Sequence, residues 1–361
     1  MTTYWVEHLL QWFEINQRYM PWREQPSPYH TWISEIMLQQ TQVATVIPYF
    51  QRFIASFPSI TALAQADQDS VLKHWEGLGY YSRARNLHKA AKVLVSEYQA
   101  QLPKDFETLQ KLPGIGFYTG AAISSIAFEQ PVPVVDGNVL RVFTRFWGIY
   151  DDIRNNRVKT MLFHKLSSYV NEGLPSQFNQ AIMELGALIC QPQNPQCGFC
   201  PLNQDCFAYE HKKQTELPVK SPAKKVPIMD VVVALIIQDK KFLIAKRKEE
   251  KMLGGLWELP GGKIEIDETP ESALIREINE ELGVKISLKF PIGLLRHAYS
   301  HFKIKLNTYV CEISAGTPKA LSGSELAWVT WEDLADYAFP KATLKVFDLI
   351  KKQFPELTQG N

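Results

Sequence analysis

Net charge and long apolar runs are both scarce in this sequence. Its 361 residues carry 39 basic and 38 acidic side chains, so the formal net charge is only +1. A charge this small excludes a chain that is basic throughout, and any nucleic-acid-binding surface must be a local patch. No apolar run is long enough to span a membrane, and the N-terminal stretch MTTYWVEHLLQWFEI lacks the basic start of a signal peptide. We therefore expect a cytoplasmic protein without a membrane partner.

Cysteine is also rare, and its distribution is uneven. Four of the five cysteines fall close together, with the spacing Cys190-x6-Cys197-x2-Cys200-x5-Cys206. Because disulfides are rare in the cytosol, this cluster indicates a metal site. Zinc ribbons usually offer two C-x2-C pairs, whereas here there is one such pair and two longer loops. The spacing favours one [4Fe-4S] cluster over a structural zinc ion. Cys311 stands apart, and we expect it to be buried in a strand.

The chain is too long for one ordinary core, and its pattern changes along its length. Apolar residues at helical spacing and punctuating prolines predict a helical domain over residues 1–210. Residues 211–226 are basic, contain prolines and lack periodicity, which is typical of a linker. From residue 227 onward, IMDVVVALIIQDKKFLIAKRK predicts two strands around a turn, and further β character follows up to residue 361.

Two motifs in the helical half could carry chemistry. In LPGIG, Gly114 and Gly116 would let backbone N–H groups point outward at a helix start, where a phosphate can bind. The same turn is often only a tight connection between helices. Asp136, in VPVVDGN, follows an apolar run and opens a helix, where it could be merely an N-cap.

The order of these motifs resembles a known family. The LPGIG hairpin, then VDGN, then the four-cysteine loop is similar to the helix-hairpin-helix DNA glycosylase superfamily with an iron–sulfur cluster loop. Within it, WISEIMLQQTQVATVIPYF and GLGYYSRARNLHKAA resemble the adenine DNA glycosylases of the MutY type. A lysine of endonuclease III that forms a Schiff base is matched here by Tyr118, so the amine nucleophile of a lyase is missing. An endonuclease III-like glycosylase stays open as an alternative.

Breaking an N-glycosidic bond needs a proton donor for the base and a negative charge for the cationic sugar. Glu35 lies among apolar residues, so a proton-bearing state is plausible, and a helix N-terminus favours ionised Asp136. The resemblance implies that Glu35 protonates adenine and activates water while Asp136 stabilises the sugar, with Tyr118 and Asn138 alongside. It implies further that Arg23 and Glu184 read adenine. It places Leu38, Gln40, Thr41, Tyr80, Gly114 and Gly116 at the DNA.

The last third resembles a different family. The pattern G-x5-E-x7-R-E-U-x-E-E-x-G-U of the Nudix fold is met in full between Gly262 and Val284, so we expect an α+β MutT-like domain. Glu277, Glu280 and Glu281 fall on one helical face, where carboxylates could hold Mg²⁺. By similarity, Tyr299, Ser300 and His301 form a loop that recognises 8-oxoguanine.

We therefore predict a multidomain protein in which an all-α helix-hairpin-helix DNA glycosylase with an iron–sulfur loop is followed by a Nudix-fold domain. Its expected function is monofunctional removal of adenine mispaired with 8-oxoguanine or guanine. The expected partner is double-stranded DNA containing A:8-oxoguanine or A:G mispairs, and the expected state is a monomer in the bacterial cytosol, associated with the nucleoid. Besides the endonuclease III-like glycosylase, two alternatives remain: a bifunctional protein that also hydrolyses oxidised nucleoside triphosphates with Mg²⁺, and a redox-responsive DNA-binding protein built around the cluster.

Overall fold

A computed structural model describes residues 4–171, 174–222, 226–299 and 301–358. The chain divides into two compact units, and the division does not follow the sequence order strictly. The first unit contains residues 1–65 and 86–223, and the second contains residues 66–85 and 224–361. The predicted ranges 1–210, 211–226 and 227–361 remain a prediction of how the chain is organised into domains.

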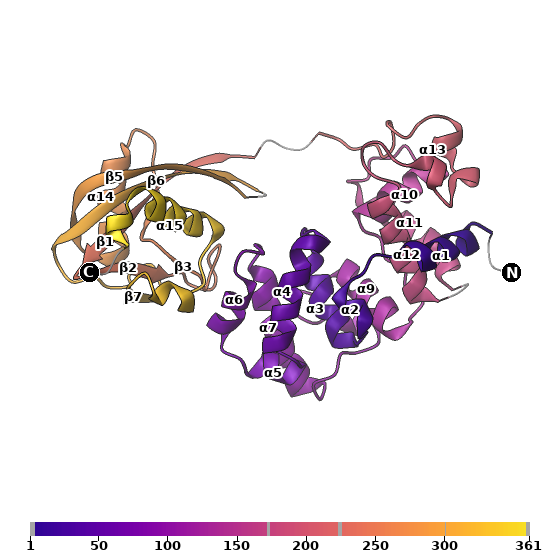
Figure 1. Ribbon diagram of the computed structural model, residues 1–361, viewed down its shortest axis with the longest axis horizontal. Helices are drawn as coiled ribbons and strands as arrows, with labels where there is room; N and C mark the ends of the chain where they lie inside the picture. The colour runs from indigo at the N-terminus through magenta and orange to yellow at the C-terminus, as the bar shows by residue number, and fades with distance from the viewer. Residues whose placement is uncertain (1–3, 172–173, 223–225, 300, 359–361) are drawn as a thin grey trace. The chain divides into compact units, whose positions relative to one another are not determined.

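The first unit is helical, as the periodicity predicts (Figure 1). Its elements are α1 (Tyr4–Asn16), α2 (Pro21–Glu24), α3 (Pro28–Leu38), α4 (Val43–Ser56), α5 (Ile60–Gln65), α7 (Ser82–Glu97, from residue 86 onward), α8 (Phe106–Leu109), α9 (Phe117–Phe128), α10 (Gly137–Trp147), α11 (Asn156–Val170), α12 (Pro175–Leu188), the 3-10 turns η1 (Cys197–Phe199) and η2 (Asn203–Asp205), and α13 (Phe207–Glu210).

Apolar packing brings segments that are distant in sequence together in this unit. Helix α1 lies against α12, and the ring of Trp5 is 6.1 Å from that of Phe178 between centroids. Trp5 also contacts Phe143 on α10, so three helices share one core. Because α1 packs beside α12, the chain that follows α1 runs past the residues of α12 that face the pocket described below.

The second unit is built on a mixed sheet. Its elements are α6 (Gln68–Trp75), β1 (Ile228–Gln238), β2 (Lys241–Lys246), β3 (Trp257–Glu258), β4 (Gly261–Lys263), α14 (Pro270–Leu282), β5 (Lys285–Ala298), β6 (Lys303–Ala315), β7 (Glu325–Val329), η3 (Asp333–Asp336), α15 (Lys341–Gln353) and η4 (Pro355–Leu357). The main strand order is β3-β2-β1-β6-β5, with β4 paired to β1 and β7 paired to β2. Strands β1 and β6 are parallel, and the other pairs are antiparallel.

The predicted hairpin at the start of this half is confirmed. Strands β1 and β2 pair with Gln238 opposite Lys241, so Asp239 and Lys240 form a two-residue turn. Both turn residues have positive φ, of 50° and 63°, which is the geometry of the tight turn that suits strand twist.

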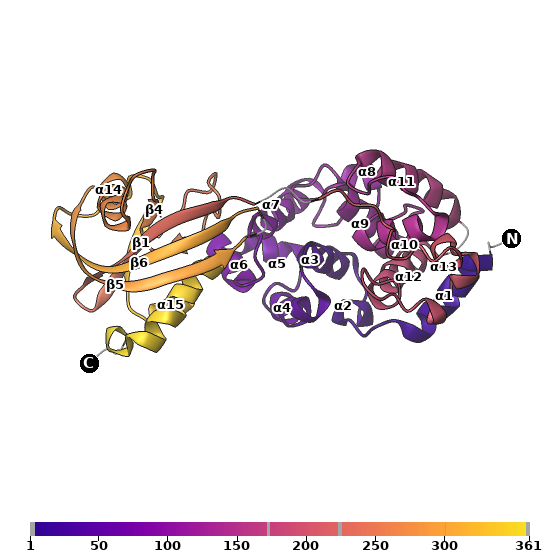
Figure 2. The ribbon, with the colours of Figure 1, turned by 90° about the horizontal axis from the view of Figure 1, so that it is seen from above.

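One helix covers each face of the sheet. Figure 2 shows α14 on one side of β1, β6 and β5, and α15 on the other. Ile278 and Leu282 of α14 share a core with Val232, Tyr309 and Cys311, so the predicted burial of Cys311 is confirmed. Val346 and Phe347 of α15 share the opposite core with Leu235, Leu306 and Val310.

Residues 66–85 fold with the second unit through several polar contacts. Lys73 donates from Nζ to the carbonyls of Leu334 and Tyr337, at 3.2 and 2.8 Å. The backbone N–H of Phe339 donates to Glu76 at 2.8 Å, and Lys246 pairs with Asp69 at 2.6 Å. Two basic side chains of the same segment, those of Arg83 and Arg85, are also buried or hydrogen-bonded within the unit. Arg83 is 8% exposed, and Arg85 donates to the carbonyl of Gly254 at 2.7 Å.

Across the residues that the structure describes, no helix is both long enough and apolar enough to cross a bilayer.

Candidate active site

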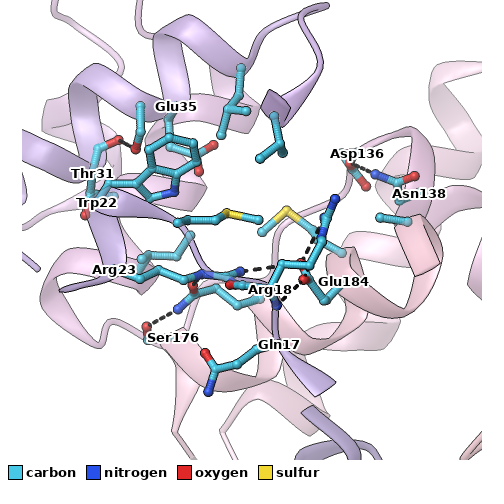
Figure 3. A pocket seen from close by; sticks show the side chains of 18 of the residues that line it. Gln17, Arg18, Trp22, Arg23, Thr31, Glu35, Asp136, Asn138, Ser176 and Glu184 are labelled. Carbon is cyan, nitrogen blue, oxygen red and sulfur yellow. Dashed lines mark hydrogen bonds and ion pairs between the residues drawn. The ribbon is translucent and has the colours of Figure 1, made fainter. Parts of the chain in front are cut away.

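A cavity of about 780 Å³ opens in the first unit, between helices from both ends of its sequence (Figure 3). It is lined by side chains from α3, the chain between α1 and α2, the start of α9, the start of α10, and α12. Among them are Arg18, Trp22, Arg23, Glu35, Leu38, Thr41, Tyr118, Asp136, Asn138, Gln180, Met183 and Glu184. Eight residues named from the sequence as catalytic, adenine-binding or DNA-binding therefore line one cavity.

Glu35 occupies the apolar wall of this cavity. It lies on α3, which begins at Pro28 and is capped by Ser27, whose side chain accepts a hydrogen bond from the N–H of His30. Trp32 and Ile33 beside it are fully buried, and Glu35 itself is only 6% exposed. Burial raises the pKa of Glu35 to about 7, and the charge of Asp136 adds to this rise. The carboxyl can therefore carry a proton near neutral pH.

Tyr118 fixes the orientation of that carboxyl. Its hydroxyl donates a hydrogen bond to Oε2 of Glu35 at 3.1 Å and lies 3.7 Å from the sulfur of Met183. Burial raises the pKa of Tyr118 well above its ordinary value, so the hydroxyl keeps its proton. This donor stabilises the ionised carboxylate and holds the pKa of Glu35 lower than burial alone would set it.

Asp136 caps the N-terminus of α10. Oδ1 accepts the N–H of Val139 at 2.7 Å, and Oδ2 accepts Nδ2 of Asn138 at 2.9 Å. Burial nevertheless raises the pKa of Asp136, although these hydrogen bonds oppose the rise. The expectation that a helix N-terminus keeps Asp136 ionised includes the stabilising effect of the helix but not the opposing effect of burial. The sequence does not show how deeply the cap is buried.

An ion-paired carboxylate lies on α12 at the far wall. Glu184 is 2% exposed, and its Oε1 accepts both the backbone N–H and Nε of Arg18, each at 2.8 Å. Oε2 accepts Nη2 of Arg18 at 3.1 Å and lies 3.6 Å from Nη2 of Arg23. Arg23 is held in turn by Oε1 of Gln180 at 2.8 Å. Sequence reasoning named Arg23 and missed Arg18, since nothing in INQRYM marks an arginine that pairs 166 residues away.

Arg141 is a second residue that the sequence did not reveal. From α10 it donates to Oδ1 of Asn138 at 2.9 Å, to the carbonyl of Gly186 at 2.7 Å and to the carbonyl of Cys190 at 2.7 Å. It therefore joins the residue beside Asp136 to the end of α12 and to the start of the cysteine loop. Its place three residues after Asn138 on a helix is the only signal that could have found it.

Two of the residues expected at the DNA, Gln40 and Tyr80, have an unusual backbone conformation. Gln40 is exposed at the end of α3 with φ of 57°, a left-handed conformation that is costly for residues other than glycine. Tyr80, which belongs to the second unit, also has a positive φ, of 49°. Such strain is often kept at functional positions.

The LPGIG hairpin follows α8 and leads into α9. Gly114 has φ of 78°, and a Cβ there would lie 2.7 Å from the Cβ of Asn86, so this position requires glycine twice over. Gly116 is the N-cap of α9, and its surroundings are open. The hairpin can therefore present free N–H groups at the start of a twelve-residue helix.

The four clustered cysteines lie in one half-buried loop after α12. Burial, with smaller contributions from the neighbouring cysteines, raises the pKa of the Cys200 thiol to about 12. Arg145 lies 3.3 Å from the sulfur of Cys190 through Nη1. Among the described residues, no three His, Cys, Asp or Glu side chains are arranged to hold a single metal ion. Four cysteine thiols as ligands, with the cationic Arg145 beside one of them, suit a negatively charged iron–sulfur centre.

The second unit has its own hollow, of about 460 Å³, on the α15 side of the sheet. Glu277, Glu280 and Glu281 of α14 line it, together with Glu258 and Arg247. Arg276 is 3.0 Å from Glu277 and 3.4 Å from Glu280, so two of the three carboxylates are already paired with a cation. Burial raises the pKa of Glu258 to about 7, against the opposing effect of Arg247.

The loop expected to recognise the opposite base lies partly outside the described residues, since Ser300 falls there. Tyr299 is half-buried, and its ring stacks on Phe302 at 4.7 Å between centroids. His301 is exposed.

Known proteins resemble both halves. The HhH-GPD superfamily of base excision DNA repair proteins matches residues 33–168, and the NUDIX domain matches residues 232–349. The chain is 35% identical over 353 residues to the adenine DNA glycosylase of Buchnera aphidicola subsp. Schizaphis graminum, which covers 97% of this chain and 100% of that protein. It is 32% identical to the human adenine DNA glycosylase, over 98% of this chain and 75% of that protein.

Solved structures resemble the helical part. A thermostable thymine-DNA glycosylase covers 57% of this chain and 95% of its own, with 27% identity and a TM-score of 0.52. A non-covalent endonuclease III–DNA complex covers 59% of this chain with 24% identity and a TM-score of 0.50, and this likeness shows the fold alone. The predicted fold class, a helix-hairpin-helix glycosylase followed by a Nudix domain, is confirmed.

Proposed function

The chain belongs to the adenine DNA glycosylase family and is a DNA glycosylase of base excision repair; on that premise we propose that it releases adenine mispaired with 8-oxoguanine or guanine in duplex DNA. The observation that carries this proposal is the pair Glu35 and Asp136, which line one cavity in different surroundings. One is enclosed by apolar side chains and the other is held by a helix N-terminus. Two carboxyls in unlike environments are what acid and charge-stabilising roles require.

The proposed reaction is hydrolysis without a covalent amine intermediate. Glu35 donates its proton to the five-membered ring of the leaving adenine, and its carboxylate then takes a proton from the attacking water. Asp136 stabilises the oxocarbenium-like sugar. Asn138 donates a hydrogen bond to Oδ2 of Asp136, and Tyr118 donates one to Glu35. The phenol of Tyr118 cannot form a Schiff base, which favours this reading over an endonuclease III-like lyase.

Adenine recognition is proposed for Glu184, Arg18 and Arg23. Oε1 of Glu184 already accepts two hydrogen bonds, whereas Oε2 accepts one at 3.1 Å. Oε2 therefore keeps a free lone pair for the exocyclic amine of adenine, a donor that guanine lacks at the same position. Burial would raise the pKa of Glu184, but the hydrogen bonds of Arg18 and the charges of Arg23 and Arg18 outweigh it, so the pKa is lowered and the carboxylate stays ionised.

Contacts with DNA and with the opposite base follow the same proposal. The partner is double-stranded DNA, bound by a monomeric protein of the bacterial cytosol. Gln40 and Tyr80 fill or wedge the base stack as adenine turns out, Leu38 and Thr41 contact the DNA with them, and the amides at Gly114 and Gly116 bind a phosphate. Tyr299, Ser300 and His301 recognise 8-oxoguanine.

Proteins of this family generally carry a four-iron cluster, and we propose that Cys190, Cys197, Cys200 and Cys206 hold one [4Fe-4S] cluster here. Its place is structural: it closes the loop that Arg141 and Arg145 contact from α10.

Single-turnover adenine release from an A:8-oxoguanine duplex tests the proposal. We expect release by the native chain and none by Glu35→Gln or Asp136→Asn, with DNA binding retained by both. The exposed Glu97→Gln is the matched control, because it makes the same chemical change on α7, away from the cavity. Borohydride should trap no protein–DNA adduct; a trapped adduct would support the lyase alternative. Adenine release by Glu35→Gln at the native rate would refute the assignment.

A second function is proposed for the Nudix half. Three carboxylates of the Nudix pattern line a hollow large enough for a nucleotide. Gly262 lets strand β4 approach Glu277, because a Cβ at this position would collide with that carboxylate. We propose Mg²⁺-dependent hydrolysis of oxidised nucleoside triphosphates there, with Glu277, Glu280 and Glu281 as ligands.

The full chain should be incubated with 8-oxo-dGTP and Mg²⁺, beside Glu280→Gln and Glu35→Gln. We expect pyrophosphate release that the first variant loses and the second keeps. If no product forms that depends on both Mg²⁺ and Glu280, this second function is rejected. The proposed glycosylase function would not be affected by that result.

A further inference from the structure

At the free end of the β5–β6 hairpin, one face of the sheet is not covered by helix α14. Helix α14 packs on Val232, Tyr309 and Cys311, which lie toward one end of strands β1 and β6. Figure 2 shows α14 over that end, while the tip of β5 extends away from it. Side chains alternate along strands, so the same face continues through residues 230 and 228 of β1 and residues 305 and 303 of β6.

Basic residues occupy this uncovered face. Arg296 of β5 pairs directly with Lys305 of β6, and Ala298 pairs with Lys303. Paired residues point to the same side, so three cations share a small area. Arg296 and Lys303 are exposed, and Lys305 is half-buried. Two like charges directly opposite one another destabilise a strand pair unless an anion offsets them.

Among the residues that the structure describes, one acid of the sheet forms an ion pair with this group. Asp230 of β1 pairs with Lys305 at 3.4 Å. In the described part of the chain, the side chains of Arg296 and Lys303 have no ion-pair or hydrogen-bond partner. The face also carries the exposed apolar side chains of Ile228, at 58%, and Leu294, at 50% exposure, and the uncharged Asn307, which pairs with Leu294. Two cations are therefore left without a counter-charge.

We propose that this face, defined by Arg296, Lys303 and Lys305, binds the phosphate backbone of duplex DNA. The proposal rests on the proposed glycosylase function, which supplies DNA as the polyanion. The hairpin that carries these cations also carries Tyr299 and His301 at its tip, the residues proposed to meet the base opposite adenine. Phosphate contacts beside such a loop would fix its register on the duplex without reading sequence. The overall net charge of +1 makes a local patch of this kind the natural way to hold DNA.

The size of the effect follows from counterion release. Each phosphate neutralised on B-DNA contributes about 0.9 to the slope of log K against log[salt]. Removing the two unpaired cations should therefore reduce the slope by about 1.8. At 0.15 M salt the same relation corresponds to a loss of about 30-fold in affinity, taken as an upper value.

The test is fluorescence anisotropy of an undamaged labelled duplex with the full chain, from 50 to 300 mM NaCl. Arg296→Gln/Lys303→Gln is compared with Lys285→Gln/Lys289→Gln, which removes the same charge from the other end of β5. In the control, Lys289 is paired with Glu312 at 2.7 Å and Lys285 is exposed. We expect weaker binding and a shallower slope only in the first variant, with the urea-unfolding midpoint of both variants close to that of the native chain.

The outcomes separate this inference from the proposed function. Equal slopes in the two double variants, or a slope equal to that of the native chain, would overturn the phosphate-binding face. Failure of the native chain to release adenine would refute the glycosylase assignment, while the slopes would still report on this face.

Discussion

Replacing Glu35 by glutamine should stabilise the protein while abolishing adenine release. The ordinary pKa of 4.5 applies in the unfolded chain, and burial raises the pKa to about 7 in the folded one. Between these values the folded state binds more protons than the unfolded state, so the free energy of unfolding falls as pH rises. At 1.36 kcal/mol for each pKa unit, the full cost of ionising Glu35 is about 3 kcal/mol, reached above pH 7.

Glutamine has the shape of glutamate but no charge, so it removes this cost. We expect the free energy of unfolding of Glu35→Gln to exceed that of the native chain by about 3 kcal/mol at pH 8 and by less than about 1 kcal/mol at pH 5. Urea unfolding followed by tryptophan fluorescence at both pH values measures the difference. Glu14→Gln, on the exposed side of α1, is the control and should change stability by less than about 0.5 kcal/mol at either pH. A difference that is equal at the two pH values, or a less stable variant at pH 8, would refute the reasoning.

Three further predictions concern the surroundings of this carboxyl. Tyr118→Phe removes a donor that lowers the pKa of Glu35, so the alkaline fall in the single-turnover rate should move up by about 1–2 pH units; an unmoved limb would contradict the hydrogen bond's role. Arg18→Ala should slow adenine release about 10- to 100-fold, because Glu184 loses charged hydrogen bonds that orient it, whereas exposed Arg52→Ala should not; equal rates would exclude Arg18 from recognition. Gly114→Ala should cost at least about 1–2 kcal/mol of stability, since it combines positive φ with a collision with Asn86, and Gly116→Ala in the same hairpin should cost less; similar urea midpoints for the two would argue against it.

The sequence predicted the elements of this protein better than their partners. Alternating and helical periodicity gave the helical first half and the hairpin of β1 and β2, because such patterns depend on residues a few positions apart. Glu35 and Asp136 could be named from motifs, and the structure places both on one cavity. The roles assigned to them stay predictions.

What the sequence could not supply depends on long-range contact. Arg18 meets Glu184 only because α1 packs beside α12, and no local pattern encodes that approach. Arg83 is a charged residue that would be expected at the surface, yet it is 8% exposed and its guanidinium lies over the rings of Trp75 and Tyr80, at 5.2 and 5.5 Å from the centroids. The raised pKa of Asp136 likewise reflects burial by residues that are distant along the chain.

The division of the chain into units has a consequence for its synthesis. Residues 66–85 leave the ribosome early, but the residues they fold with begin at position 224. At about 5–20 residues per second, translation of the intervening chain takes on the order of ten seconds. During that time Lys73, Glu76 and Asp69 lack the partners that the last third of the chain supplies, and Leu72 lacks the loop at Gly255 beside it. Residues 66–85 therefore remain without their folding partners while the rest of the first unit is synthesised. The last third of the chain supplies those partners only when translation is nearly over.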